Sequence, residues 1–215
     1  MIRDILILCA AGMLVCAYLM VGQKALFTAI RLYAVQSLLL GIVAVTIAFS
    51  EPRHHLLVMA ALTITLKGIL IPWFLMRVID RIGIHREIEP FVNVPASLLV
   101  CLGLTVVGYR VSTGFPEETE GVTHHLVGVA LSMLLIGLFL MVTRKKAVTQ
   151  ILALLTVENA VFLVALGVTS GMPLVVELGI SFDVILAVLV LGILVHRIVD
   201  RFESMDISRL SKLKG

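Results

Sequence analysis

Residues 125–143 read HLVGVALSMLLIGLFLMVT, a run without a single Asp, Glu, Lys or Arg. A helix needs roughly 20 predominantly apolar residues to cross the ~30 Å hydrocarbon core of a bilayer. The chain has 215 residues, of which 60% are hydrophobic and 14% charged, and its mean hydropathy is +1.12. We therefore predict an all-α integral membrane protein with about seven transmembrane helices. The other six predicted spans are approximately 4–22, 27–49, 55–78, 94–112, 147–169 and 174–196.

The distribution of Lys and Arg predicts the orientation of these spans. If the first span runs inward, twelve such residues collect on one face and three on the other. Cytoplasmic loops carry the excess of Lys and Arg, so we expect the N-terminus outside, the C-terminus in the cytoplasm, and a location in the cytoplasmic (inner) membrane. The net charge of +3 then reflects topology and indicates no nucleic-acid partner. The richer face holds Lys24, Arg77, Arg81, Arg86, Arg144, Lys145, Lys146, Arg197, Arg201, Arg209, Lys212 and Lys214, against Arg3, Arg53 and Arg110.

The chain contains a candidate internal repeat. RVIDR at 77–81 ends the third predicted span, and RIVDR at 197–201 ends the seventh. We interpret 1–82 and 125–215 as two parallel three-helix units, the second with a short cytoplasmic tail. The connecting residues 83–124 would form a linker with the fourth span. Apolar sequences match one another easily, so unrelated helices are the alternative.

Three ionisable side chains fall near the middle of predicted spans: Lys67, Glu158 and Asp183. At 1.5 Å per residue they lie roughly 18, 16 and 14 Å deep. A charge at that depth costs several kcal/mol and needs a partner, a water-filled cavity or a function. Two facing carboxylates in a low dielectric should not both stay ionised, so we interpret the set as a switchable proton site. The alternative is structural, with Lys67 locking helices together by pairing with a carboxylate.

Further polar residues accompany this predicted proton path. In the repeat, Gln36 takes the position of Glu158. Asn159 follows Glu158, and an asparagine there more often links helices by hydrogen bonds than forms a site. Glu177 lies a few residues inside the outer face, where headgroups or water can solvate it. Pro72 follows Lys67 by five residues and loosens the backbone there, with a plain kink as the simplest outcome.

No pattern in the sequence is typical of a catalytic or metal site. The cysteines lie inside apolar segments without CxxC spacing, and no histidine falls in the interior of a predicted span. Neither a nucleophile–base arrangement nor a phosphate-binding glycine loop is present. We therefore predict a non-catalytic membrane chain that holds no cofactor or metal of its own.

Three motifs of the C-terminal half are distinctive: Val157-Glu158-Asn159, VELGI at 176–180 followed by Asp183, and the ending LSKLKG at 210–215. They resemble component E of hydrogenase-4, and Gln36-Ser37 and Lys67 with Pro72 extend the resemblance more weakly toward the N-terminus. That family is similar to the K-type membrane subunit of complex I and to the C subunit of Mrp-type antiporters. Residues 125–215 would be the corresponding three-helix part.

The resemblance implies a membrane-arm subunit of a multi-subunit nickel–iron hydrogenase, of hydrogenase-4 or formate hydrogenlyase type. In the K-type subunit two membrane glutamates form part of a proton path. Asp183 matches the second by position, whereas Glu158 lies three residues past the first. The nickel–iron centre and iron–sulfur clusters would belong to partners: hydrogenase large and small subunits, antiporter-like membrane subunits and a formate dehydrogenase. A stand-alone secondary transporter and a passive scaffold of the complex are the alternatives.

Overall fold

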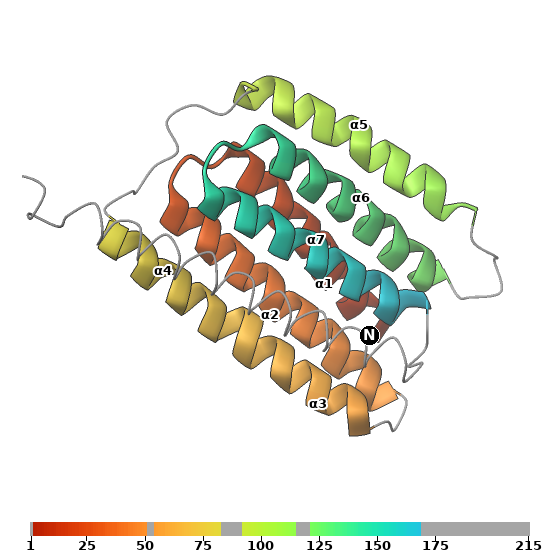
Figure 1. The fold of residues 1–215 in the computed structure, drawn as a ribbon. Coiled ribbons are helices and arrows are strands. Elements are labelled where there is room, and N and C mark those ends of the chain that lie inside the picture. The colour runs from red at the N-terminus through yellow and green to blue at the C-terminus, as the bar shows by residue number, and fades with distance from the viewer. Residues whose placement is uncertain (1, 51–53, 83–91, 115–120, 169–215) are drawn as a thin grey trace, which may run out of the picture. The chain divides into compact units, whose positions relative to one another are not determined.

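The computed structural model describes residues 2–50, 54–82, 92–114 and 121–168, and helices fill almost all of them (Figure 1). Within these ranges six helices are long and apolar enough to cross a membrane, and no strand occurs. The prediction of an all-helical membrane protein is therefore confirmed. The elements are α1 (Ile2–Gly22), α2 (Leu26–Ser50), α3 (His54–Leu62), the π-helix η1 (Thr63–Leu70), α4 (Ile71–Ile82), α5 (Val94–Ser112), α6 (Gly121–Thr143) and α7 (Ala147–Val168).

The predicted spans agree closely with five of the observed helices. Span 94–112 coincides with α5, and the boundaries of α1, α2 and α7 differ from prediction by one or two residues. Helix α6 begins four residues earlier than predicted. The seventh span, 174–196, lies outside the described residues. The orientation in the membrane and the two-unit repeat stay predictions.

The third predicted span is not the simple kinked α-helix that we expected. It consists of α3, η1 and α4 in succession, and η1 is an eight-residue π-helix. The amide of Ile71, which follows η1, bonds to the carbonyl of Leu66, five residues earlier. Pro72 has no N–H to give to the turn before it, so the α-helical ladder is already interrupted here. η1 accommodates this interruption with hydrogen bonds between residues five apart, the spacing of a π-helix.

Helix α6 lies between α5 and α7 and also contacts α1, while α2 contacts α1, α7 and the segment α3–η1–α4 (Figure 1). Small residues permit the closest of these approaches. A Cβ at Gly108 of α5 would lie 2.7 Å from the backbone nitrogen of Ser132 in α6. A Cβ at Gly137 of α6 would lie 2.6 Å from Cγ2 of Val157 in α7. Helices packed in lipid gain from such contacts because apolar burial provides little drive there.

Candidate functional site

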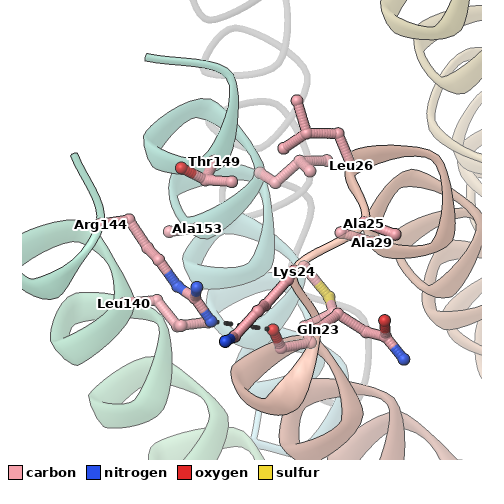
Figure 2. A pocket seen from close by; sticks show the side chains of 11 residues that line it. Gln23, Lys24, Ala25, Leu26, Ala29, Leu140, Arg144, Thr149 and Ala153 are labelled. Atoms are coloured by element: carbon pink, nitrogen blue, oxygen red, sulfur yellow. Dashed lines mark hydrogen bonds between the residues drawn. The ribbon is translucent and has the colours of Figure 1, made fainter. Parts of the chain in front are cut away.

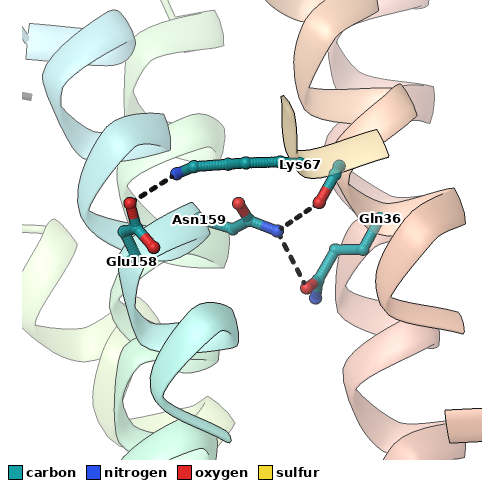
Figure 3. Close-up of polar contacts among 5 residues, drawn as sticks. Gln36, Lys67, Glu158 and Asn159 are labelled. Atoms are coloured by element: carbon teal, nitrogen blue, oxygen red, sulfur yellow. Dashed lines mark hydrogen bonds and ion pairs between the residues drawn. The ribbon is translucent and has the colours of Figure 1, made fainter. Parts of the chain in front are cut away.

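An ion pair between η1 and α7 lies inside the helical bundle (Figure 3). Lys67 Nζ is 2.9 Å from Glu158 Oε1, and the side chains are only 2% and 4% exposed. Nζ also lies 5.8 Å from the ring centroid of Phe162, one helical turn beyond Glu158 on the same face. Removing either charge from water costs several kcal/mol, so the close pairing is what makes both charges tolerable here.

The π-helix positions Lys67 for this pairing. Lys67 lies in the middle of η1, and π-helical segments occur frequently at functional sites. The next residue, Gly68, allows η1 to approach α2, since a Cβ there would lie 3.0 Å from Leu38 Cδ2. From η1 the long Lys67 side chain extends to Glu158 of α7.

Buried amides connect three helices beside the ion pair (Figure 3). Gln36 Nε2 of α2 donates to the Met13 carbonyl of α1 at 3.1 Å. Asn159 Nδ2 of α7 donates to Gln36 Oε1 at 3.3 Å and to Ser37 Oγ at 3.1 Å. Gln36, Ser37 and Asn159 are fully buried. The predicted link between helices at Asn159 is therefore present, and it is continuous with the charged site at Glu158.

The Met13 carbonyl sets the direction of these hydrogen bonds. A carbonyl only accepts, so the Gln36 amide must present nitrogen to Met13 and oxygen to Asn159. Asn159 must then present its nitrogen to Gln36, which leaves Oδ1 on the side of Lys67 (Figure 3). Among the described residues, neither Asn159 Oδ1 nor Glu158 Oε2 has a hydrogen-bond donor.

Four of the six predicted path residues thus come together at the junction of α2, η1 and α7: Gln36, Lys67, Glu158 and Asn159. Asp183 and Glu177 lie outside the described residues, as does any contact between Asp183 and Glu158. Phe162 and the Met13 carbonyl also contact these residues, and neither was predicted from the sequence. Only the spacing of four residues after Glu158 could have indicated Phe162.

Sequence comparison relates nearly the whole chain to known proteins. The chain is 34% identical over 206 residues to the uncharacterised protein Rv0085 of Mycobacterium tuberculosis, covering 95% of this chain and 94% of that one. It is 27% identical over 207 residues to hydrogenase-4 component E of Escherichia coli and of Shigella flexneri, covering 96% and 95%. The chain is a homologue of hydrogenase-4 component E. It is a multi-pass inner-membrane protein. No family model and no solved structure matches it.

This component E homologue has a second buried cation, Arg144, in the connection between α6 and α7. Its Nη2 donates to the Val21 carbonyl at 2.5 Å and to the Met20 carbonyl at 3.4 Å, and the residue is 5% exposed. These carbonyls end α1 and have no partner within their own helix. Arg144 therefore caps the C-terminus of α1, where positive charge also favours the helix dipole.

A small cavity adjoins Arg144 (Figure 2). Its volume of about 20 Å³ has room for one water molecule. Its lining is mostly apolar, with polar side chains from Gln23, Lys24, Arg144 and Thr149. Met20, Gln23, Lys24, Ala25, Leu26, Ala29, Leu140, Arg144, Thr149, Leu152 and Ala153 line it.

The described part of this component E homologue offers no metal site. Within it, no three His, Cys, Asp or Glu side chains lie close enough together to hold an ion. Its three cysteines are free and buried. At the Lys67–Glu158 pair, both side chains are groups that can gain and lose protons.

Proposed function

We propose that this chain is a membrane-arm subunit of a multi-subunit nickel–iron hydrogenase, of hydrogenase-4 or formate hydrogenlyase type. Similarity to hydrogenase-4 component E along almost the full length supports membership of such a complex. In the proposal the subunit contributes to proton translocation that is coupled to redox chemistry in its partners. The single observation that carries this second part is the buried Lys67–Glu158 ion pair.

In the proposed mechanism, the Lys67–Glu158 ion pair is the element that switches between two protonation states. A proton added to the Glu158 carboxylate removes the attraction between this carboxylate and the Lys67 ammonium, which is strong in a low dielectric. A change of charge in a neighbouring subunit, or at Asp183, would shift the balance between these states. Moving one charge across the membrane exchanges about 2.3 kcal/mol per 100 mV, so a small redox drop is enough to drive it. Gln36, Asn159 and Glu177 complete the proposed path.

The metal chemistry belongs to other chains in this proposal. Hydrogenase large and small subunits would hold the nickel–iron centre and iron–sulfur clusters, and antiporter-like subunits and a formate dehydrogenase would complete the assembly. The N-terminus would lie outside and the basic C-terminal side in the cytoplasm, facing the peripheral subunits. The two three-helix units, 1–82 and 125–215, would flank the linker with its fourth span.

Copurification tests the membership of the complex. The tagged chain is purified from its own membranes in mild detergent, and mass spectrometry identifies what accompanies it. Nickel–iron hydrogenase subunits and antiporter-like proteins are the expected partners. A chain that purified alone and moved a solute in liposomes would instead be a stand-alone transporter.

A passive scaffold is the second candidate, because the amide contacts among Gln36, Ser37 and Asn159 hold α2 and α7 together in any case. Charge-neutral variants separate the two functions. Glu158→Gln and Asp183→Asn should still assemble with their partners, but hydrogen turnover should no longer acidify or alkalise vesicles. Thr156→Val on α7 is the control, since the Thr156 hydroxyl donates to the Leu152 carbonyl of its own helix. If Glu158→Gln assembled and kept full coupling, the scaffold function would replace the proposed one.

A further inference from the structure

Two buried acceptor atoms beside the ion pair lack a donor among the described residues: Glu158 Oε2 and Asn159 Oδ1. Glu158 is 4% exposed and Asn159 is completely buried. Acceptors as buried as these are almost always hydrogen-bonded in native proteins, and where protein groups do not supply the donor, ordered water does. Ordered water is therefore the donor that both atoms require.

Asn159 cannot remove this requirement by turning its amide over. A flipped Asn159 would place Oδ1 against Gln36 Oε1, so two acceptors would face each other. Gln36 cannot flip in turn, because its oxygen would then face the Met13 carbonyl. The amide contacts therefore hold Asn159 Oδ1 on the side of the Lys67–Glu158 pair (Figure 3).

We propose that ordered water binds here and donates hydrogen bonds to Glu158 Oε2 and to Asn159 Oδ1. This water is the immediate proton donor and acceptor of Glu158, a role that rests on the proposed function. When an excess proton reaches the water, one O–H bond of the hydronium breaks and a new one forms at Oε2. The products are a neutral carboxylic acid and a neutral water. Gln36 and Asn159 act as positioning residues, since they fix the acceptor that orients the water.

The same site favours a proton over sodium as the coupling ion. The ammonium of Lys67 already balances the charge of the Glu158 carboxylate. A sodium ion would add an unbalanced charge next to that ammonium and would need several oxygen ligands. The acceptors beside the pair that lack a donor among the described residues need hydrogens, which water supplies and a sodium ion does not.

Infrared difference spectroscopy tests the bound water. The native complex, in lipid nanodiscs, is compared between acidic and neutral buffer in ordinary and ¹⁸O-labelled water. We expect an isotope-sensitive O–H stretching band from bound water, and a carboxylic C=O band that disappears in Glu158→Gln. Asn159→Leu should abolish the water band and shift the C=O band. Gln36→Leu should weaken the water band while Asn159 remains, and the control Thr156→Val should change neither band.

Each contrary result overturns a defined part of the proposal. If the parent protein had no isotope-sensitive band, or if Asn159→Leu and Gln36→Leu both retained it, the water site would be wrong. If exchanging potassium for sodium in the buffer removed the band, the assignment to protons would be wrong. A water band in a chain that copurifies with no hydrogenase subunit would contradict the proposed function and leave the water site intact. Coupling that depends on Glu158 in a complex without a water band would overturn the water site and leave the proposed function intact.

Discussion

Lys67 Nζ and Glu158 Oε1 lie 2.9 Å apart although the two residues come from helices far apart in sequence. The contact makes η1 and α7 depend on each other electrostatically. Neither side chain has access to bulk water, so the energy of one charge is set by the presence of the other. Stability therefore depends on this contact, and in the proposed function the movement of charge depends on it as well.

The first prediction follows from that dependence. Lys67→Met or Glu158→Leu should each lower the free energy of unfolding by about 3–5 kcal/mol, because each leaves one buried charge without its partner. The double variant should recover most of this loss, since it buries no charge. Thermal unfolding of the purified protein in one detergent measures all four forms. Losses that simply add in the double variant would show that the pair is not energetically coupled.

A second prediction concerns the amide contacts between α2 and α7. Gln36→Leu should cost more than Ser37→Ala, because it removes the hydrogen bond to the Met13 carbonyl as well as one contact of Asn159. Hydrogen bonds between membrane helices contribute about 0.6 kcal/mol on average and up to about 1.7 kcal/mol. We expect a difference of about 1 kcal/mol between the two variants in the same unfolding assay. Equal losses would contradict a directional network.

The helices of this protein could be predicted from the sequence because lipid imposes one simple requirement on each span. An apolar run of sufficient length must satisfy its own backbone hydrogen bonds, and a helix does this locally. The same local logic indicated that Lys67 and Glu158 needed partners. It could not say which helix supplied them, since the order of helices in a bundle depends on contacts between distant residues.

The π-helix η1 could not be predicted from the local sequence alone. Pro72 indicated an interrupted ladder, but whether a backbone answers with a kink or a wider turn depends on what packs beside it. Here Gly68 lies against Leu38 of α2, a contact that no local sequence pattern predicts. The direction of the Gln36–Asn159 hydrogen bond has a similar origin, because the carbonyl that fixes it belongs to α1.

A third prediction concerns the cap on α1. Arg144→Gln should lower the free energy of unfolding by about 1–3 kcal/mol, because buried carbonyls at Met20 and Val21 lose a charged donor. Lys24→Gln removes the same charge at the same cavity, but Lys24 is exposed and should change stability little. Thermal unfolding compares the two. If both variants lost the same stability, the effect would come from net charge and not from capping.

The last prediction tests the close approach of α5 and α6. Gly108→Ala should destabilise the protein by about 1–3 kcal/mol, because the new methyl group would lie 2.7 Å from Ser132 N and 2.9 Å from Ser132 Cα. Backbone atoms cannot move aside as a side chain can, so the helices must separate. Gly103→Ala on the same helix is the matched control, since its methyl group meets no described atom within 4 Å.

The control should be neutral or more stable by up to about 1 kcal/mol, because alanine is the better helix former. A disulfide between cysteines engineered across α5 and α6 would report the separation directly. It should form more slowly in Gly108→Ala than in Gly103→Ala. If both alanine variants unfolded at the same temperature and crosslinked at the same rate, α5 would not pack against α6 through Gly108.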